Sequence, residues 1–191
     1  MQKNFDSALA HVLSFAGGWC ERSFNSAAAA NRGITLAMLE RHRGQSAAVD
    51  ALRALTKKET AAIYRALYWD ACHCGQLPSG IDLAVLDCAV TEGPALAVRV
   101  LQEAANVKAD GLIGPVTLAA VLSAPPEALL AAFISNRMQA RGLKQRLARL
   151  FALRPALRLV ATHTAALALM PRNSGAAARS GKARAAQTPV S

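Results

Sequence analysis

The sequence predicts an all-α protein, and three observations lead to that prediction. Apolar residues make up 53% of the 191-residue chain, with many alanines and leucines, which is typical of packed helices. These residues repeat at helical spacing along most of the chain. Alternating patterns that would indicate strands are nearly absent. A chain of this length can bury a core of its own without disulfides or metal ions.

The first predicted helix begins at Phe5, and the glycine pair Gly17-Gly18 ends it. Its apolar face consists of Phe5, Leu9, Val12, Leu13 and Ala16. Residues 19–33 are predicted to form a long loop, with Asn31 and Gly33 as turn residues. The first helix is therefore followed by an irregular segment rather than directly by a second helix.

Two threonines mark the starts of the next helices. Thr35 is placed to cap a helix over residues 36–43. Thr56 and Glu59 form a capping box, which opens a helix that continues through Tyr68. Turns at residues 77–80 and 93–94 separate the later segments. Further helices are predicted over residues 81–90, 95–105, 116–123 and 126–137.

Positive charge is concentrated at the C-terminal end. The net charge is +10 and the pI about 10.2, and no acidic residue follows Glu127. The cations after position 136 are Arg137, Arg141, Lys144, Arg146, Arg149, Arg154, Arg158, Arg172, Arg179, Lys182 and Arg184. This asymmetry predicts attraction to a polyanion, which can be nucleic acid, anionic lipid or an acidic wall polymer.

The N-terminus does not resemble a signal peptide, because charged residues flank a short apolar run that His11 interrupts. No stretch of about 18 uncharged apolar residues predicts a spanning helix. We therefore expect the protein to be made in the bacterial cytoplasm. Action at the periplasm or cell wall would then require holin-type release.

The four cysteines are expected to be free thiols, because the compartment is reducing. Cys72-His73-Cys74 suggests zinc, but structural zinc sites usually place two or more residues between their thiolates. No metal site and no cofactor are predicted, and the role of Cys72 and Cys74 stays open.

The segment from Phe5 to Thr35, FDSALAHVLSFAGGWCERSFNSAAAANRGIT, resembles the opening of the muramidases of glycoside hydrolase family 108. In that family the first helix ends in Glu-Gly-Gly and an aromatic residue, and the Glu is the catalytic acid. This chain has Ala16-Gly17-Gly18-Trp19. The resemblance thus implies a phage endolysin or secretion-activating muramidase in a degenerate form.

The resemblance continues along the chain. The segments YRALYWD (64–70), LPSGID (77–82) and LDCAV (86–90) look like the second half of a lysozyme-like lobe. Val100-Leu101-Gln102, followed by ADGLIGPVT (109–117), looks like a peptidoglycan-binding lobe, in which Gly111 and Gly114 permit a tight loop and Thr117 can cap a helix. The implied domains are residues 5–90 and 91–137, the second with an extension to about residue 165 left open.

Departures from the family pattern gather around the expected catalytic site. Besides Ala16, the chain has Asn25, Ala27-Ala28 and Ala30 where the family has an Asp, two glycines and a Thr. A methyl group cannot donate the proton that glycoside hydrolysis requires. Possible substitute acids are Glu21, otherwise a solvated loop residue, and Asp87, otherwise a structural carboxylate. The implied substrate-binding residues are Trp19, Asn31, Thr35, Tyr68 and Trp69, although core packing is the commoner role for such aromatics.

The C-terminal segment departs most. Leu143, Leu147, Leu150 and Phe151 are spaced to form a basic amphipathic helix that Pro155 would break. Residues 171–191 have few large apolar side chains and are predicted to be a disordered basic tail. A reading frame shifted after about residue 137 would also produce Ala- and Arg-rich sequence without acids.

Three functions remain open from the sequence. The first is a phage- or prophage-type muramidase-like protein that binds peptidoglycan glycan strands without cutting them. The second is an active N-acetylmuramidase that uses a relocated acid. The third is a basic polyanion-binding protein, which rests on the tail alone. Specific nucleic-acid recognition is not expected, because the tail lacks interleaved aromatic residues.

Overall fold

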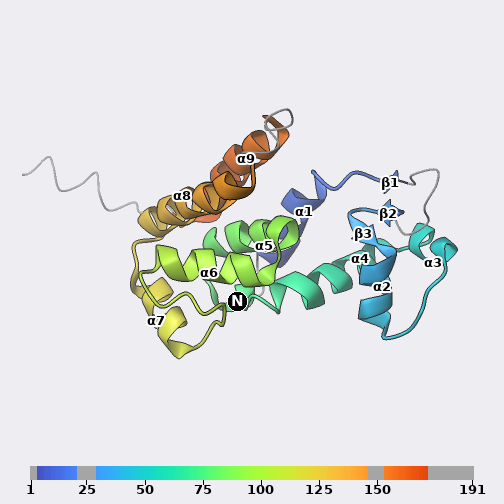
Figure 1. The fold of residues 1–191 in the computed structure, drawn as a ribbon, viewed down its shortest axis with the longest axis horizontal. Helices are drawn as coiled ribbons and strands as arrows, with labels where there is room; N and C mark the ends of the chain where they lie inside the picture. The colour runs from blue at the N-terminus through green and yellow to red at the C-terminus, as the bar shows by residue number, and fades with distance from the viewer. Residues whose placement is uncertain (1–3, 21–28, 146–152, 172–191) are drawn as a thin grey trace, which may run out of the picture.

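The structure, a computed structural model, describes residues 4–20, 29–145 and 153–171 (Figure 1). The described chain is mostly helical, as predicted. Its helices are α1 (Phe5–Leu13), α2 (Leu36–Arg43), α3 (Val49–Arg53), α4 (Lys57–Tyr64), a π-helical turn (Arg65–Trp69), a 3₁₀ turn (Cys74–Gln76), α5 (Ile81–Glu92), α6 (Pro94–Ala104), α7 (Pro115–Ser123), α8 (Pro126–Gln145) and α9 (Leu153–Leu169).

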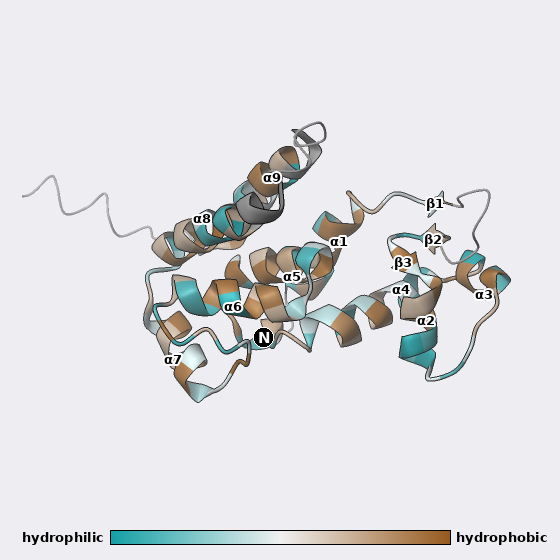
Figure 2. Cartoon of the chain, viewed as in Figure 1, coloured by the Kyte–Doolittle hydropathy of each residue, from teal (hydrophilic) through white to brown (hydrophobic). Residues whose placement is uncertain are grey.

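Helix α5 forms the centre of the molecule. Its residues 81–89 are all buried, and it packs against α1, α6, α8 and α9. A helix that is surrounded on all sides has no polar face, which explains its continuous apolar sequence. Figure 2 shows apolar residues along α5 and α6, and one cluster of buried side chains joins Phe5 of α1 to Met170 after α9. Both predicted lobes therefore share a continuous core.

Residues 19–35 contain a small sheet where the sequence predicts a loop. Three two-residue strands, β1 (Trp19–Cys20), β2 (Ala30–Asn31) and β3 (Ile34–Thr35), pair antiparallel in the order β1-β2-β3. Arg32 and Gly33 connect β2 to β3 with φ values of 51° and 77°, the conformation of a tight hairpin turn. The loop prediction is thus wrong here, because two-residue strands are too short to show an alternating pattern.

Local capping signals are confirmed at two helix starts. The Thr35 hydroxyl accepts a hydrogen bond from the backbone N–H of Met38 at 3.3 Å, and the Thr56 hydroxyl accepts one from Glu59 at 3.1 Å. Thr117, in contrast, does not cap α7. It lies inside that helix, where its hydroxyl accepts a hydrogen bond from Gln102 at 3.2 Å. Helix α3, with five residues, was not predicted.

The C-terminal segment folds back onto the first lobe. Helix α8 continues to Gln145, eight residues past the predicted end, and α9 packs on α5 and α8. Pro155 lies in the first turn of α9, where a missing N–H costs little. The predicted amphipathic helix through Leu147, Leu150 and Phe151, which Pro155 was expected to break, lies largely outside the described residues. Leu159 and Ala166 are buried. This packing argues against a frame shift at residue 137, whereas residues 172–191 of the predicted tail lie outside the described residues.

No single described helix is long and apolar enough to cross a membrane. Only the bent pair of α7 and the first part of α8, at 117° to each other, reaches that length and composition together. In this fold Val121 of α7 and Leu129, Leu130 and Phe133 of α8 are buried within the protein.

Gly80, at the start of α5, lies against α9 and provides a test of that packing. A Cβ added at Gly80 would collide with the carbonyl oxygen of Ala166 and lie 3.0 Å from Met170, and its φ of 90° disfavours other residues. Gly80→Ala should lower the free energy of unfolding by about 1–3 kcal/mol, measured by urea denaturation. Gly18→Ala, with nothing within 4 Å, is the control; equal midpoints for both variants would contradict this placement of α9.

Candidate functional site

Ala16 lies just beyond α1, facing the hairpin turn. Its backbone N–H donates to the carbonyl oxygen of Leu13 at 3.1 Å, and its side chain is half-buried. A Cβ placed on Gly33 would be 3.2 Å from the Ala16 Cβ and 2.5 Å from the Tyr64 hydroxyl. Ala16, which the sequence resemblance aligns with the family acid, is therefore bordered by the β2–β3 turn, where Gly33 also lies against Tyr64 and other residues would be strained.

Hydrogen bonds hold this hairpin in place. The Asn31 side-chain amide donates to the carbonyl oxygens of Leu52 and Arg53 at 3.0 and 3.1 Å, and the Tyr64 hydroxyl donates to that of Arg32 at 3.0 Å. Asn31 is 8% exposed. The structure thus gives Asn31 and Thr35, predicted to bind substrate, structural roles: one anchors the hairpin to α3 and the other caps α2.

The three candidate aromatic residues are placed differently. Trp69 is 2% exposed and packs edge-on against Phe5, with ring centroids 5.2 Å apart, so the predicted stacking of Trp69 on a sugar is wrong. Tyr68 is half-buried and lines a groove of about 580 Å³ between α2 and the junction of α5 with α6. Trp19 is half-buried, with the Arg53 guanidinium 4.8 Å from its ring centroid. Tyr68 and Trp19 remain accessible to a ligand.

Asp87 is a buried structural carboxylate and not a replacement acid. It is fully buried, and its two oxygens accept hydrogen bonds from Arg137 of α8 at 2.9 Å and from Arg158 of α9 at 2.8 Å. Arg137 also contacts Glu92 at 3.0 Å. This placement argues against the substitute role, because a carboxylate that is fully buried and bonded to two guanidinium groups has no access to a glycan.

The side chains that the structure places nearest to Gly33, opposite Ala16, include no carboxylate. Burial raises the pKa of Tyr64, whose hydroxyl lies beside Gly33, to about 12; Tyr68 contributes to the increase and Arg158 opposes it. Asp6 lies near the start of α1, roughly 12 Å along the helix from its end. Glu21, the other predicted substitute, lies outside the described residues, as do Asn25, Ala27 and Ala28.

In the second lobe, the side chain of Gln102 holds the loop between α6 and α7 in place. Gln102 belongs to the Val100-Leu101-Gln102 motif of the sequence, but the motif did not reveal this role. The Gln102 amide donates to the Asp110 carboxylate at 2.8 Å, to the Leu112 carbonyl at 2.9 Å and to Thr117, and its oxygen accepts from the Gly111 N–H at 2.8 Å. Gly111 has a φ of 84°. One buried amide thus fixes the loop between α6 and α7 and leaves Leu112 73% exposed.

The cysteines of the described residues are Cys20, Cys72, Cys74 and Cys88, all free. A hydrogen bond from Cys74 lowers the pKa of Cys72, and burial raises that of Cys74. Within the part of the chain that the structure describes, no three His, Cys, Asp or Glu side chains come together in a way that would hold a metal ion.

A helical lobe with a small hairpin beside the end of its first helix, joined to a second helical lobe, defines a lysozyme-like protein with a wall-binding module. The family model described as Glycosyl hydrolase 108 matches residues 9–93, and that described as Predicted Peptidoglycan domain matches residues 96–148. The chain belongs to glycoside hydrolase family 108 and is a muramidase-like protein directed to peptidoglycan.

A solved structure supports the same assignment. The solved structure of SagA from Brucella abortus has a sequence 33% identical to this chain and superposes with a TM-score of 0.79. The match covers 91% of this chain and 99% of the SagA chain. No curated protein matched the sequence. Because 91% of the chain is covered, the similarity extends past residue 137 and includes part of the segment for which a shifted frame was considered.

Proposed function

We propose that this protein binds the glycan strands of peptidoglycan and does not hydrolyse them at the rate of an active muramidase. The observation that carries this proposal is Ala16 at the position of the family acid, packed against Gly33 and Tyr64. General acid catalysis needs a protonated carboxyl within hydrogen-bond reach of the leaving oxygen. Asp87, the described residue that was considered as a substitute acid, is buried and forms ion pairs with Arg137 and Arg158.

Binding does not depend on the missing acid. The ordered loop around Gln102 and the accessible rings of Trp19 and Tyr68 keep surfaces that suit a sugar polymer. Because the loop and the two rings are present although position 16 has no carboxyl group, a binding role is favoured over complete loss of function. An active N-acetylmuramidase using Glu21 as its acid is the second candidate, favoured by the position of Glu21 five residues after Ala16.

The setting that we propose is a phage, prophage or phage-like particle. The protein would be made in the bacterial cytoplasm and reach the wall by holin-type release. Of the eleven cations after residue 136, the nine other than Arg137 and Arg158, which pair with Asp87, would add attraction to anionic surfaces without specificity for nucleic acid.

Sedimentation with purified sacculi tests binding and separates the contribution of the tail. The truncated version should end at Pro171, because α9 (Leu153–Leu169) belongs to the core and must be kept. It lacks Arg172, Arg179, Lys182 and Arg184. At low salt the full chain should bind more strongly than the truncated one. Near 1 M salt both should bind alike, because screening shortens to about 3 Å while the contacts of the folded lobes persist.

The same comparison on anionic vesicles and on DNA should show retention of the full chain only at low salt. Loss of all sacculus binding at high salt by both versions would contradict the proposed recognition of glycan. Equal, salt-independent retention of both versions on vesicles would contradict the proposed role of the tail.

A further inference from the structure

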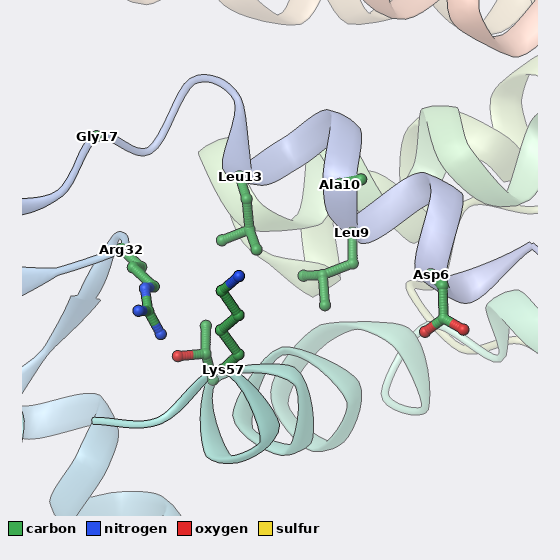
Figure 3. Close-up of a pocket in the computed structure, with 8 residues that line it drawn as sticks. Asp6, Leu9, Ala10, Leu13, Gly17, Arg32 and Lys57 are labelled. Atoms are coloured by element: carbon green, nitrogen blue, oxygen red, sulfur yellow. The ribbon is translucent and has the colours of Figure 1, made fainter. Parts of the chain in front are cut away.

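A second cavity lies between α1 and α4, beneath the hairpin turn. Its volume is about 450 Å³, and Leu9 and Leu13 of α1 form its apolar wall (Figure 3). Gly17 also lines it, one residue after Ala16. The cavity therefore extends along α1 from the residue next to Ala16, and it shares no lining residue with the groove that Tyr68 lines.

The two ends of this cavity carry opposite charges. Arg32, from the hairpin turn, and Lys57, from the first turn of α4, lie at the end near Gly17, and Asp6 lies at the opposite end of α1 (Figure 3). Arg32 Nη1 donates to the Leu55 carbonyl at 3.3 Å, which holds the guanidinium in place. The positive end of the α4 dipole adds to the attraction for an anion.

This arrangement fits a short peptide better than a sugar chain. None of the described residues that line the cavity is aromatic, so this part of the lining offers no ring to stack on a pyranose. Two cations suit a carboxylate, the leucines suit alanine methyl groups, and Asp6 suits an ammonium group. Short peptides with these three groups hang from the glycan of peptidoglycan, next to the bonds that a muramidase cuts.

We propose that the cavity between α1 and α4 binds the peptide stem of peptidoglycan. A stem carboxylate lies against Arg32 and Lys57, alanine methyls contact Leu9 and Leu13, and the free amine of a diaminopimelate residue faces Asp6. This proposal rests on the peptidoglycan-directed character of the protein. It does not depend on whether the glycan is cut.

The test is calorimetric titration of the full chain with a synthetic stem tetrapeptide of alanine, γ-linked glutamate, diaminopimelate and alanine. Lys57→Gln should weaken binding about tenfold or more, as expected for loss of a charge-assisted contact. Lys58→Gln is the matched control, because it removes the same charge from the next residue of α4, which is exposed and does not line the cavity. Thermal unfolding of both variants checks that each is folded.

Asp6→Asn tests the orientation of the peptide. It should weaken binding of the tetrapeptide with a free diaminopimelate amine and leave unchanged that of a tetrapeptide with this amine acetylated. Three results would each overturn the proposal: equal effects of Lys57→Gln and Lys58→Gln, competition by glycan strands stripped of peptide, or inorganic phosphate binding as tightly as the tetrapeptide. Because the tetrapeptide contains no glycosidic bond, failure of this binding is distinguishable from an unexpected muramidase activity.

Discussion

Purified protein should release reducing ends from sacculi at least about 10²-fold more slowly than an active family 108 muramidase under the same conditions. The reason is the methyl group of Ala16, which lies beside Gly33 at the position where the sequence resemblance places the acid of the family. Loss of a positioned general acid costs about 10²- to 10⁴-fold. A rate within about tenfold of the active enzyme would contradict the proposed loss of hydrolysis, because losing the general acid should reduce the rate by at least about 10²-fold.

Ala16→Glu should restore little activity by itself. The family pattern also has an Asp, a glycine pair and a Thr where this chain has Asn25, Ala27-Ala28 and Ala30, so the returned carboxyl would lack its surroundings. Glu21→Gln addresses the relocated acid, with the exposed Glu103→Gln of the second lobe as its matched control. Residual hydrolysis that Glu21→Gln abolishes and Glu103→Gln leaves intact would establish the second candidate function instead.

The features that sequence predicts well here are those encoded within a few residues. Thr35 and Thr56 each cap a helix through a bond to the third residue along, and Pro94 begins α6 directly after Gly93. Such contacts depend on local spacing alone. The loop around Asp110 and Gly111 in the second lobe was likewise predicted from sequence. The role of Thr117 was not, because its hydroxyl accepts a hydrogen bond from Gln102, 15 residues away.

The features that sequence did not predict depend on distant partners. Asp87 was a candidate acid because a carboxylate inside an apolar helix is unusual, but its partners Arg137 and Arg158 are 50 and 71 residues away. Trp69 was a candidate for stacking on a sugar, but its ring packs edge-on against Phe5, which is 64 residues earlier in the sequence. The cations after position 136, Arg137 among them, were predicted together to attract a polyanion, whereas Arg137 is 1% exposed.

Asp87→Ala should lower the free energy of unfolding by about 3–5 kcal/mol, the cost of leaving a buried charge without its partner. Arg137 would keep only Glu92 and Thr91 as counterparts, at 3.0 and 2.7 Å, and Arg158 would lose the carboxylate that ties α9 to α5. Urea denaturation measures this loss. The surface pair of Arg43 and Glu59 is the control: its side chains are 31% and 28% exposed, so Glu59→Ala should cost under about 1 kcal/mol.

The order of the two arginine variants follows from their burial. Arg137→Met should destabilise the protein more than Arg158→Met, because the Arg137 side chain is 1% exposed and contacts both Asp87 and Glu92, whereas that of Arg158 is 17% exposed. In Arg158→Met, Arg137 still neutralises Asp87. The double variant Asp87→Ala with Arg137→Met should cost less than the sum of the two single changes, because each removes the partner that the other leaves buried. Additive costs would mean that the two side chains do not share one buried interaction across α5 and α8.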